Sequence, residues 1–189
     1  LFDRFMAEGI KFVVASGNQY RQIIQQFPKH KHLMSFVAEN GGHSIENGRT
    51  LQEEFEKIEA ISALVNYIEK HYPDTVINLA GKASSYLPMS TPKKVKDLLS
   101  YYLPVLKYVD NLHPIPEDDY FKVTLLVCDE LTFQVRDEIN TLFADYQLTA
   151  TSSGFGCIDV IPSHVHKGTG LDFLLNHWGY GPENLMVFG

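Results

Sequence analysis

The sequence predicts an α/β protein in which a core built on a parallel sheet is interrupted by an inserted α+β domain. Residues 11–27 pass from a short apolar run into a helical pattern, and the same order of strand and helix returns after Pro162. Between these segments the alternation loosens. Because the first and last segments share a pattern that the middle lacks, we expect one discontinuous core domain (1–52 and 162–189) carrying an insertion (53–161).

The composition is that of an ordinary globular protein. The 189 residues are 44% hydrophobic and 21% charged, with a net charge of −7. An acidic chain without a basic patch is a poor partner for nucleic acid or an anionic membrane, and no run approaches the roughly 18–20 apolar residues that span a bilayer. Cys128 and Cys157 sit singly in apolar runs, which favours buried, reduced thiols over a disulfide or metal pair. We therefore expect a cytoplasmic protein with no nucleic-acid, membrane or obligate protein partner.

Residues 1–9 predict a helix that is already in mid-course at the first residue. Phe2, Phe5 and Met6 share one face and Gly9 ends the pattern, but no capping residue opens it. We therefore expect the natural chain to extend further upstream.

The next element is a strand, turn and helix. Residues 12–15 form an apolar run that is too short for a helix but suits a strand buried on both faces. Four apolar residues then recur at i, i+3, i+4 and i+7: Tyr20, Ile23, Ile24 and Phe27. This spacing predicts a helix over 18–27, so Ser16, Gly17 and Asn18 form a tight turn of the kind at which phosphates bind.

A second strand, over residues 36–38, completes a βαβ pattern and runs into the turn Asn40-Gly41-Gly42. A hairpin should follow, because Asn47 and Gly48 supply the two positive-φ positions of a type I′ turn.

The insertion is predicted to hold about three helices over a largely antiparallel sheet. The helices are expected over 53–71, 92–102 and 131–143. Strands are expected near 75–80, 105–109, 120–128, 147–151 and 157–161. Apolar residues expected to face the core include Ile58, Leu98 and Leu142.

After Pro162 the helical spacing returns. Leu171, Leu174 and Trp178 share a face and Gly179 ends the helix, after which residues 185–188 should begin another buried strand.

Chemistry is expected at the carboxyl ends of the core strands, where ligands gather in open parallel sheets. Three turns lie there: Ser16–Asn18, Asn40–Gly42 and Lys167–Thr169. Each also has an ordinary explanation. Ser16 can offer its hydroxyl to a phosphate or simply cap a helix, and Asn-Gly-Gly is common turn material.

Lys167 is harder to explain by stability alone, because a cation in the first turn of a helix opposes the helix dipole. A nearby anion accounts for it better, although a solvated surface lysine also fits. At about 4 Å and an effective dielectric of about 20, the attraction to such an anion is roughly 4 kcal/mol.

Taken together, "FVAENGG", "IDVIPSHVHKGTGLDFLLNHWG" and "NLMVFG" resemble the Cof-like sugar phosphatases of the haloacid dehalogenase superfamily, over nearly the whole chain. The resemblance implies a Rossmann-like core with an inserted cap that selects the substrate. Ser16 matches the family's Ser or Thr after the second strand, and Lys167 matches its Lys at the start of a later helix. By resemblance, Ser16 hydrogen-bonds the transferring phosphoryl group and Lys167 steadies the nucleophile beside it. The substrate-binding residues are expected to be Gly17, Asn18, Asn40 and Gly41, with Asn40 and the Gly41 N–H near the phosphate or leaving group.

The sequence departs from the family in three places. The family usually has Arg where this chain has Asn18, so the substrate contact of that arginine is not carried over. No Asp-x-Asp nucleophile loop precedes the opening helix, and the chain ends at Gly189, one residue before the expected magnesium-binding aspartate. The resemblance therefore implies a longer parent that is a magnesium (Mg2+)-dependent phosphatase, hydrolysing a sugar phosphate or similar small phosphorylated metabolite through an aspartyl-phosphate. The 189 residues alone are expected to have no turnover.

Other functions remain open at this point. A phosphomutase or phosphotransferase of the same superfamily shares Ser16 and Lys167, and a catalytically inactive phosphosugar-binding protein would keep the site without the nucleophile. The pairs His30/His32 and His164/His166 lack a third ligand at helical spacing, which disfavours zinc. The Gly-Thr-Gly that follows Lys167 is not a dinucleotide-binding loop, because its glycines lie inside the start of a helix.

Overall fold

The computed structural model describes residues 2–189, which fold as two compact units. One, the split unit, combines the chain up to Glu53 with Val165–Gly189. The other, the inserted unit, is Glu54–His164. Both mix helices and strands, which confirms the predicted α/β class. None of the helices in the described part of the chain has the length and apolarity of a membrane span.

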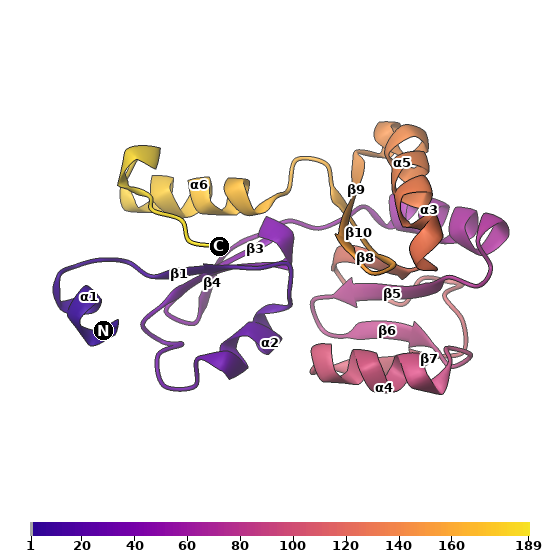
Figure 1. The fold of residues 1–189 in the computed structure, drawn as a ribbon, viewed down its shortest axis with the longest axis horizontal. Helices are drawn as coiled ribbons and strands as arrows, with labels where there is room; N and C mark the ends of the chain where they lie inside the picture. The colour runs from indigo at the N-terminus through magenta and orange to yellow at the C-terminus, as the bar shows by residue number, and fades with distance from the viewer. Residues whose placement is uncertain (1) are drawn as a thin grey trace. The chain divides into compact units, whose positions relative to one another are not determined.

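The split unit is built on a four-stranded sheet in the order β1-β2-β3-β4 (Figure 1). The strands are β1 (Val13–Ala15), β2 (Ser35–Ala38), β3 (His43–Glu46) and β4 (Arg49–Glu53). β1 and β2 run parallel, whereas the other neighbours are antiparallel. The predicted hairpin is confirmed, with φ of 52° at Asn47 and 77° at Gly48 between β3 and β4.

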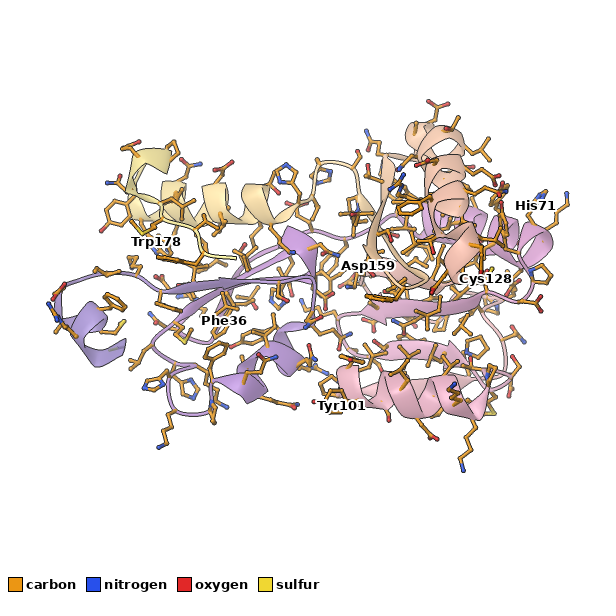
Figure 2. The ribbon with its side chains drawn as sticks, viewed as in Figure 1. Phe36, His71, Tyr101, Cys128, Asp159 and Trp178 are labelled. Carbon is orange, nitrogen blue, oxygen red and sulfur yellow. The ribbon has the colours of Figure 1, made fainter. Side chains whose placement is uncertain are left out.

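Helices α2 (Tyr20–Ile23) and α6 (Lys167–Trp178) cover opposite faces of this sheet (Figure 1). Successive residues of a strand point to opposite faces. Phe36 accordingly packs on α2, where its ring centroid lies 5.4 Å from that of Tyr20. Figure 2 labels Phe36. The neighbouring Val37 meets Gly170 of α6. β2 is therefore buried on both sides. The strand predicted to be buried on both faces was the one over residues 12–15, and that prediction is wrong: β1 is only partly buried and Phe12 is 39% exposed.

Helix α2 is shorter than predicted. Gln19 is extended, so the helix begins at Tyr20 and not at residue 18, and at Ile24 it tightens into a 3-10 turn (Ile24–Gln26). The predicted apolar face is nevertheless confirmed, because Ile23 is buried and its three partners in the pattern pack around the same cluster.

Both ends of the split unit carry smaller elements. The predicted first helix is present as α1 (Phe2–Ala7), and Gly9 follows it with φ of 75°. Leu1 and the side chain of Phe2, which that prediction included, lie outside the part that the structure describes.

The prediction of a buried strand over 185–188 is wrong for the structure described. Residues 182–184 form a 3-10 turn and no described strand pairs with those that follow. Met186 and Phe188 are 77% and 86% exposed. An apolar run forms a strand only where a neighbouring strand accepts its backbone hydrogen bonds.

The inserted unit holds a six-stranded sheet in the order β7-β6-β5-β8-β10-β9. Its strands are β5 (Val76–Gly81), β6 (Ser85–Pro88), β7 (Leu106–Val109), β8 (Tyr120–Leu126), β9 (Leu148–Gly154) and β10 (Cys157–Pro162). All neighbours are antiparallel except β6 and β7. The helices are α3 (Ile58–His71), α4 (Lys93–Tyr102) and α5 (Thr132–Leu142). The prediction of three helices with a largely antiparallel sheet is confirmed, although β6 was not predicted.

Some side chains of the inserted unit point away from the core where the sequence predicted them inside it. Ile58, Leu98 and Leu142 are each more than two fifths exposed. Leu98 and Leu99 are about 100° apart on their helix, so only one of them can face the sheet, and it is Leu99. The cysteines also differ from the prediction: both are free, but Cys128 is exposed and Cys157 only half-buried.

Candidate active site

The carboxyl ends of β1 and β2 meet at one edge of the split unit's sheet. Ala15 is paired with Val37, so the turn that begins at Ser16 and the turn that begins at Glu39 leave the sheet side by side. This follows from the parallel pairing, because parallel strands bring like ends together.

Backbone hydrogen bonds join these two turns. The Ser16 N–H donates to the Val37 carbonyl over 2.8 Å, and the Asn40 N–H donates to the Ser16 carbonyl over 3.2 Å. The Glu39 N–H donates to the Asn18 carbonyl over 3.1 Å. These hydrogen bonds join the two turns into one unit, which we call the double turn (residues 16–18 and 39–41).

Ser16 is not the N-cap of α2. The sequence alone had left open whether Ser16 caps a helix or offers its hydroxyl to a phosphate. The residue at the N-terminus of α2 is Gln19, and its side chain makes no capping hydrogen bond. The Ser16 Oγ instead accepts from the Asn18 N–H over 3.1 Å, inside the turn. A serine hydroxyl that accepts one hydrogen bond can still donate its own hydrogen, so Ser16 keeps a donor for a ligand.

Asn40 lies against Gly17. A Cβ on Gly17 would sit 2.5 Å from Asn40 Oδ1, so no larger residue fits at position 17 while that amide stays where it is. Glu39 and Asn40 have φ of 48° and 59°. Asparagine tolerates this left-handed conformation better than most residues, which fits its place at the tip of the turn.

The third predicted segment, at the start of α6, reaches the double turn through Gly41. Gly41 has φ of 118°, and a Cβ there would lie 2.1 Å from the His166 carbonyl oxygen and 3.1 Å from the Lys167 nitrogen. The structure thus brings together the backbones of all three segments that the sequence singled out. Lys167 is the first residue of α6, and its side chain is exposed.

Gly170 makes a second close contact that sequence reasoning missed. A Cβ on Gly170 would lie 2.4 Å from Val37 Cγ1 and 3.2 Å from the Gly41 carbonyl oxygen. The first turn of α6 therefore packs directly on the end of β2. A glycine four residues after the N-cap of an amphipathic helix was the available signal, since glycine weakens helices and needs a packing reason there.

His166 was also missed as a functional candidate. It is the N-cap of α6: its Nδ1 accepts from the Thr169 N–H over 3.2 Å, and Thr169 Oγ1 accepts from the His166 N–H over 3.1 Å. The His-x-x-Thr spacing matches a capping box, but histidine is not a usual residue in it.

The three segments that meet here carry groups that can bind an anion. They are the Ser16 hydroxyl, the Asn40 amide and the N-terminus of a twelve-residue helix that begins with the exposed Lys167. Among the side chains that the structure describes, no group of three or more His, Cys, Asp or Glu is placed to hold a metal ion.

Comparison with known proteins shows the family of the chain. The chain matches the haloacid dehalogenase-like hydrolase family over residues 1–189. It is 35% identical over 188 residues to 5-amino-6-(5-phospho-D-ribitylamino)uracil phosphatase YbjI of Escherichia coli (strain K12), covering 100% of this chain and 68% of that protein.

Among solved structures, SMU.1108c from Streptococcus mutans UA159 is 37% identical with a TM-score of 0.94, and the match covers 100% of this chain and 70% of that one. A haloacid dehalogenase-like hydrolase from B. subtilis shares the fold at 13% identity, with a TM-score of 0.78 over 95% of this chain and 71% of that one. The chain belongs to the haloacid dehalogenase-like hydrolase family.

Proposed function

We propose that this chain carries the phosphate-binding side of a phosphatase that hydrolyses a phosphate monoester of a small metabolite, such as a sugar phosphate. The observation that supports this most is the contact of the double turn with the start of α6, which gathers a hydroxyl, an amide and a lysine-bearing helix end at one edge. The phosphatase relative, YbjI, supports the reaction class.

In this proposal the residues act by electrostatics. Ser16 donates its hydroxyl hydrogen to the transferring phosphoryl group, and Asn40 and the Gly41 N–H lie at the phosphate or leaving group. The Lys167 ammonium offsets the repulsion between an anionic nucleophile and the dianionic substrate, worth roughly 4 kcal/mol at about 4 Å and an effective dielectric of about 20. Gly17 lets the Asn40 amide lie close, whereas Asn18 supplies the N–H that orients Ser16.

The nucleophilic aspartate and the ligands of the Mg2+ cofactor are proposed to come from residues outside these 189. Mg2+ would supply charge stabilisation when bound, and the 189 residues alone would show no turnover. We also propose that the inserted unit is the cap that selects the substrate, and that the protein works in the cytoplasm, where free thiols such as Cys128 persist.

The test uses a protein extended at both ends to the length of its relatives. Phosphate release from a panel of phosphate monoesters is measured with and without Mg2+, for the unchanged protein and for Lys167→Ala. We expect Mg2+-dependent release, lowered about a hundredfold or more by Lys167→Ala.

Three results would contradict the proposal. Equal turnover by the two proteins would remove Lys167 from the mechanism. Transfer of the phosphoryl group to an added sugar in preference to water would indicate a phosphotransferase. Binding of sugar phosphates without release would indicate an inactive binding protein.

A further inference from the structure

We infer that His166 is a positioning residue for Lys167: its neutral imidazole caps α6 and its carbonyl lies against Gly41, which together set where the Lys167 side chain begins. This inference rests on the proposed function, because it takes Lys167 to act on the phosphoryl group.

The His166 imidazole takes part in a reciprocal capping box with Thr169. Nδ1 of His166 accepts from the Thr169 N–H over 3.2 Å. In return, Thr169 Oγ1 accepts from the His166 N–H over 3.1 Å and donates to the His166 carbonyl over 2.8 Å. Two backbone donors that a helix start normally leaves open are thereby satisfied.

The capping role fixes the protonation state of the ring. A backbone N–H can only donate, so Nδ1 must carry a lone pair and the ring proton must sit on Nε2. An imidazolium would lose this acceptor. It would also place a second positive charge beside Lys167 at the positive end of the helix dipole. His166 therefore performs this role only as the neutral Nε2–H tautomer.

Both sides of His166 are packed against glycine backbone. A Cβ on Gly168 would lie 3.0 Å from both Cε1 and Nδ1 of the imidazole, so the ring lies over that residue. A Cβ on Gly41 would lie 2.1 Å from the His166 carbonyl oxygen. Lys167 lies between His166 and Gly168 in the sequence, so these two contacts fix the position of its backbone.

This placement matters because the Lys167 side chain itself is long and exposed. Its backbone is the part that the fold can fix. A displacement of about 1 Å in a group that acts on the reacting atoms can lower a rate by about a hundredfold. Releasing the cap should therefore lower turnover through Lys167, without removing any group that touches the substrate.

The test is a double-mutant cycle in the extended protein, with Mg2+ and p-nitrophenyl phosphate: unchanged, His166→Ala, Lys167→Ala and the double variant. His166→Asn is the matched control, because asparagine is a strong N-cap acceptor. We expect His166→Ala to lower kcat about tenfold or more with KM within about threefold, and His166→Asn to stay within about threefold of the unchanged protein. In the Lys167→Ala background His166→Ala should cause no further loss.

Each alternative result has a distinct meaning. If Lys167→Ala lowers kcat but His166→Ala does not, the inference fails and the proposed function stands. If His166→Ala lowers kcat equally in both backgrounds, or His166→Asn fails to rescue a folded protein, His166 does not act through Lys167. If Lys167→Ala has no effect on kcat, the proposed function is contradicted, and the inference about His166 is contradicted with it.

A readout independent of activity completes the test. Nitrogen-15 NMR of the histidine rings in the 189-residue chain should show His166 as the Nε2–H tautomer at neutral pH. The Nδ1–H tautomer would overturn the capping role.

Discussion

The carbonyl oxygen of His166 occupies the space in which a side chain on Gly41 would have to begin, 2.1 Å from the ideal Cβ position. Two segments that are far apart in the sequence are therefore in backbone contact at the edge of the sheet. Only glycine, which has no Cβ, allows so close a contact. The φ of 118° at Gly41 is a second reason for glycine at this position.

Gly41→Ala should therefore destabilise the fold and displace the start of α6. The new Cβ must push the His166 carbonyl away, and alanine must also adopt an unfavourable φ, at a combined cost of about 2 kcal/mol or more. The measurement is the free energy of unfolding in urea. Gly154→Ala is the matched control, because Gly154 has φ of 88° but a Cβ there would meet no other atom within 4 Å. Equal losses in the two variants would mean that the contact with His166 contributes nothing.

Ser16→Ala should lower turnover far more than it lowers stability. The variant removes the proposed hydroxyl donor to the phosphoryl group, for which we expect about a tenfold to hundredfold loss in kcat. It also removes the acceptor of the Asn18 N–H, but this hydrogen bond lies at the exposed surface, so water can replace it at a cost under about 1 kcal/mol. Ser16→Thr keeps the hydroxyl and should stay within about fivefold of the unchanged protein. Phosphate release by Ser16→Ala at the unchanged rate would exclude the hydroxyl from the site.

Glu56 should make the inserted unit less stable as the pH rises. Only 8% of this residue is exposed, and neither carboxyl oxygen has a hydrogen-bond partner among the described residues. Burial, with a smaller contribution from the charge of Asp159, raises its pKa well above the ordinary 4.5. The raised pKa means that the folded state holds the proton more tightly than the unfolded state. The contribution to stability is therefore complete below about pH 4.5 and is lost as the pH rises through the folded-state pKa.

Glu56→Gln removes this ionisation. We expect the variant to gain stability over the unchanged protein progressively as the pH is raised above about 4.5, measured by urea unfolding at a series of pH values. A difference between the two proteins that does not change with pH would show that Glu56 is not held in its neutral form.

Glu46 should have the opposite pH dependence. Burial alone would raise its pKa, but hydrogen bonds from Lys11 and Trp178 outweigh that effect and the pKa is lowered. The stability that Glu46 contributes is therefore present above its ordinary pKa of 4.5 and is lost as the pH falls through the lowered folded-state value. The Trp178 Nε1–H donates to Glu46 Oε1 over 2.7 Å, and Figure 2 shows Trp178 at the end of α6.

Glu46→Gln should thus cost about 1–2 kcal/mol at neutral pH and less at acidic pH. Trp178→Phe keeps a ring for Lys11, whose Nζ lies 4.6 Å from the indole centroid, and loses only the N–H. It should cost about 1 kcal/mol. Urea unfolding at neutral and acidic pH measures both, and a loss for Glu46→Gln that grows on acidification would contradict the assignment.

The sequence predicted those features of the structure that depend on short-range patterns of residues along the chain. Strand β2, the hairpin at Asn47 and Gly48, and the convergence of Ser16 with Asn40 all follow from short-range patterns and from the rule that parallel strands share an edge. Lys167 was expected at the same edge from its place at the start of a helix, and the family resemblance added its role beside the nucleophile.

Features that depend on side-chain hydrogen bonds or on contacts between distant segments were not predictable in this way. The Ser16 Oγ accepts from the Asn18 N–H in the turn, and the extended Gln19 delays the start of α2 to Tyr20. Gly170 is glycine because Val37 lies beneath it, and His166 is a cap because of Thr169. Periodicity also does not decide which of two adjacent leucines, such as Leu98 and Leu99, will face a sheet.

The central claim is that Ser16, Asn40 and Lys167 surround one phosphate. The most direct test is a crystal structure of the extended protein with Mg2+ and bound inorganic phosphate or vanadate. We expect the Ser16 hydroxyl, the Asn40 amide and the Lys167 ammonium to lie within about 2.7–3.2 Å of the same anion. An anion bound elsewhere, or a Lys167 nitrogen more than about 12 Å from the Ser16 hydroxyl, would contradict it.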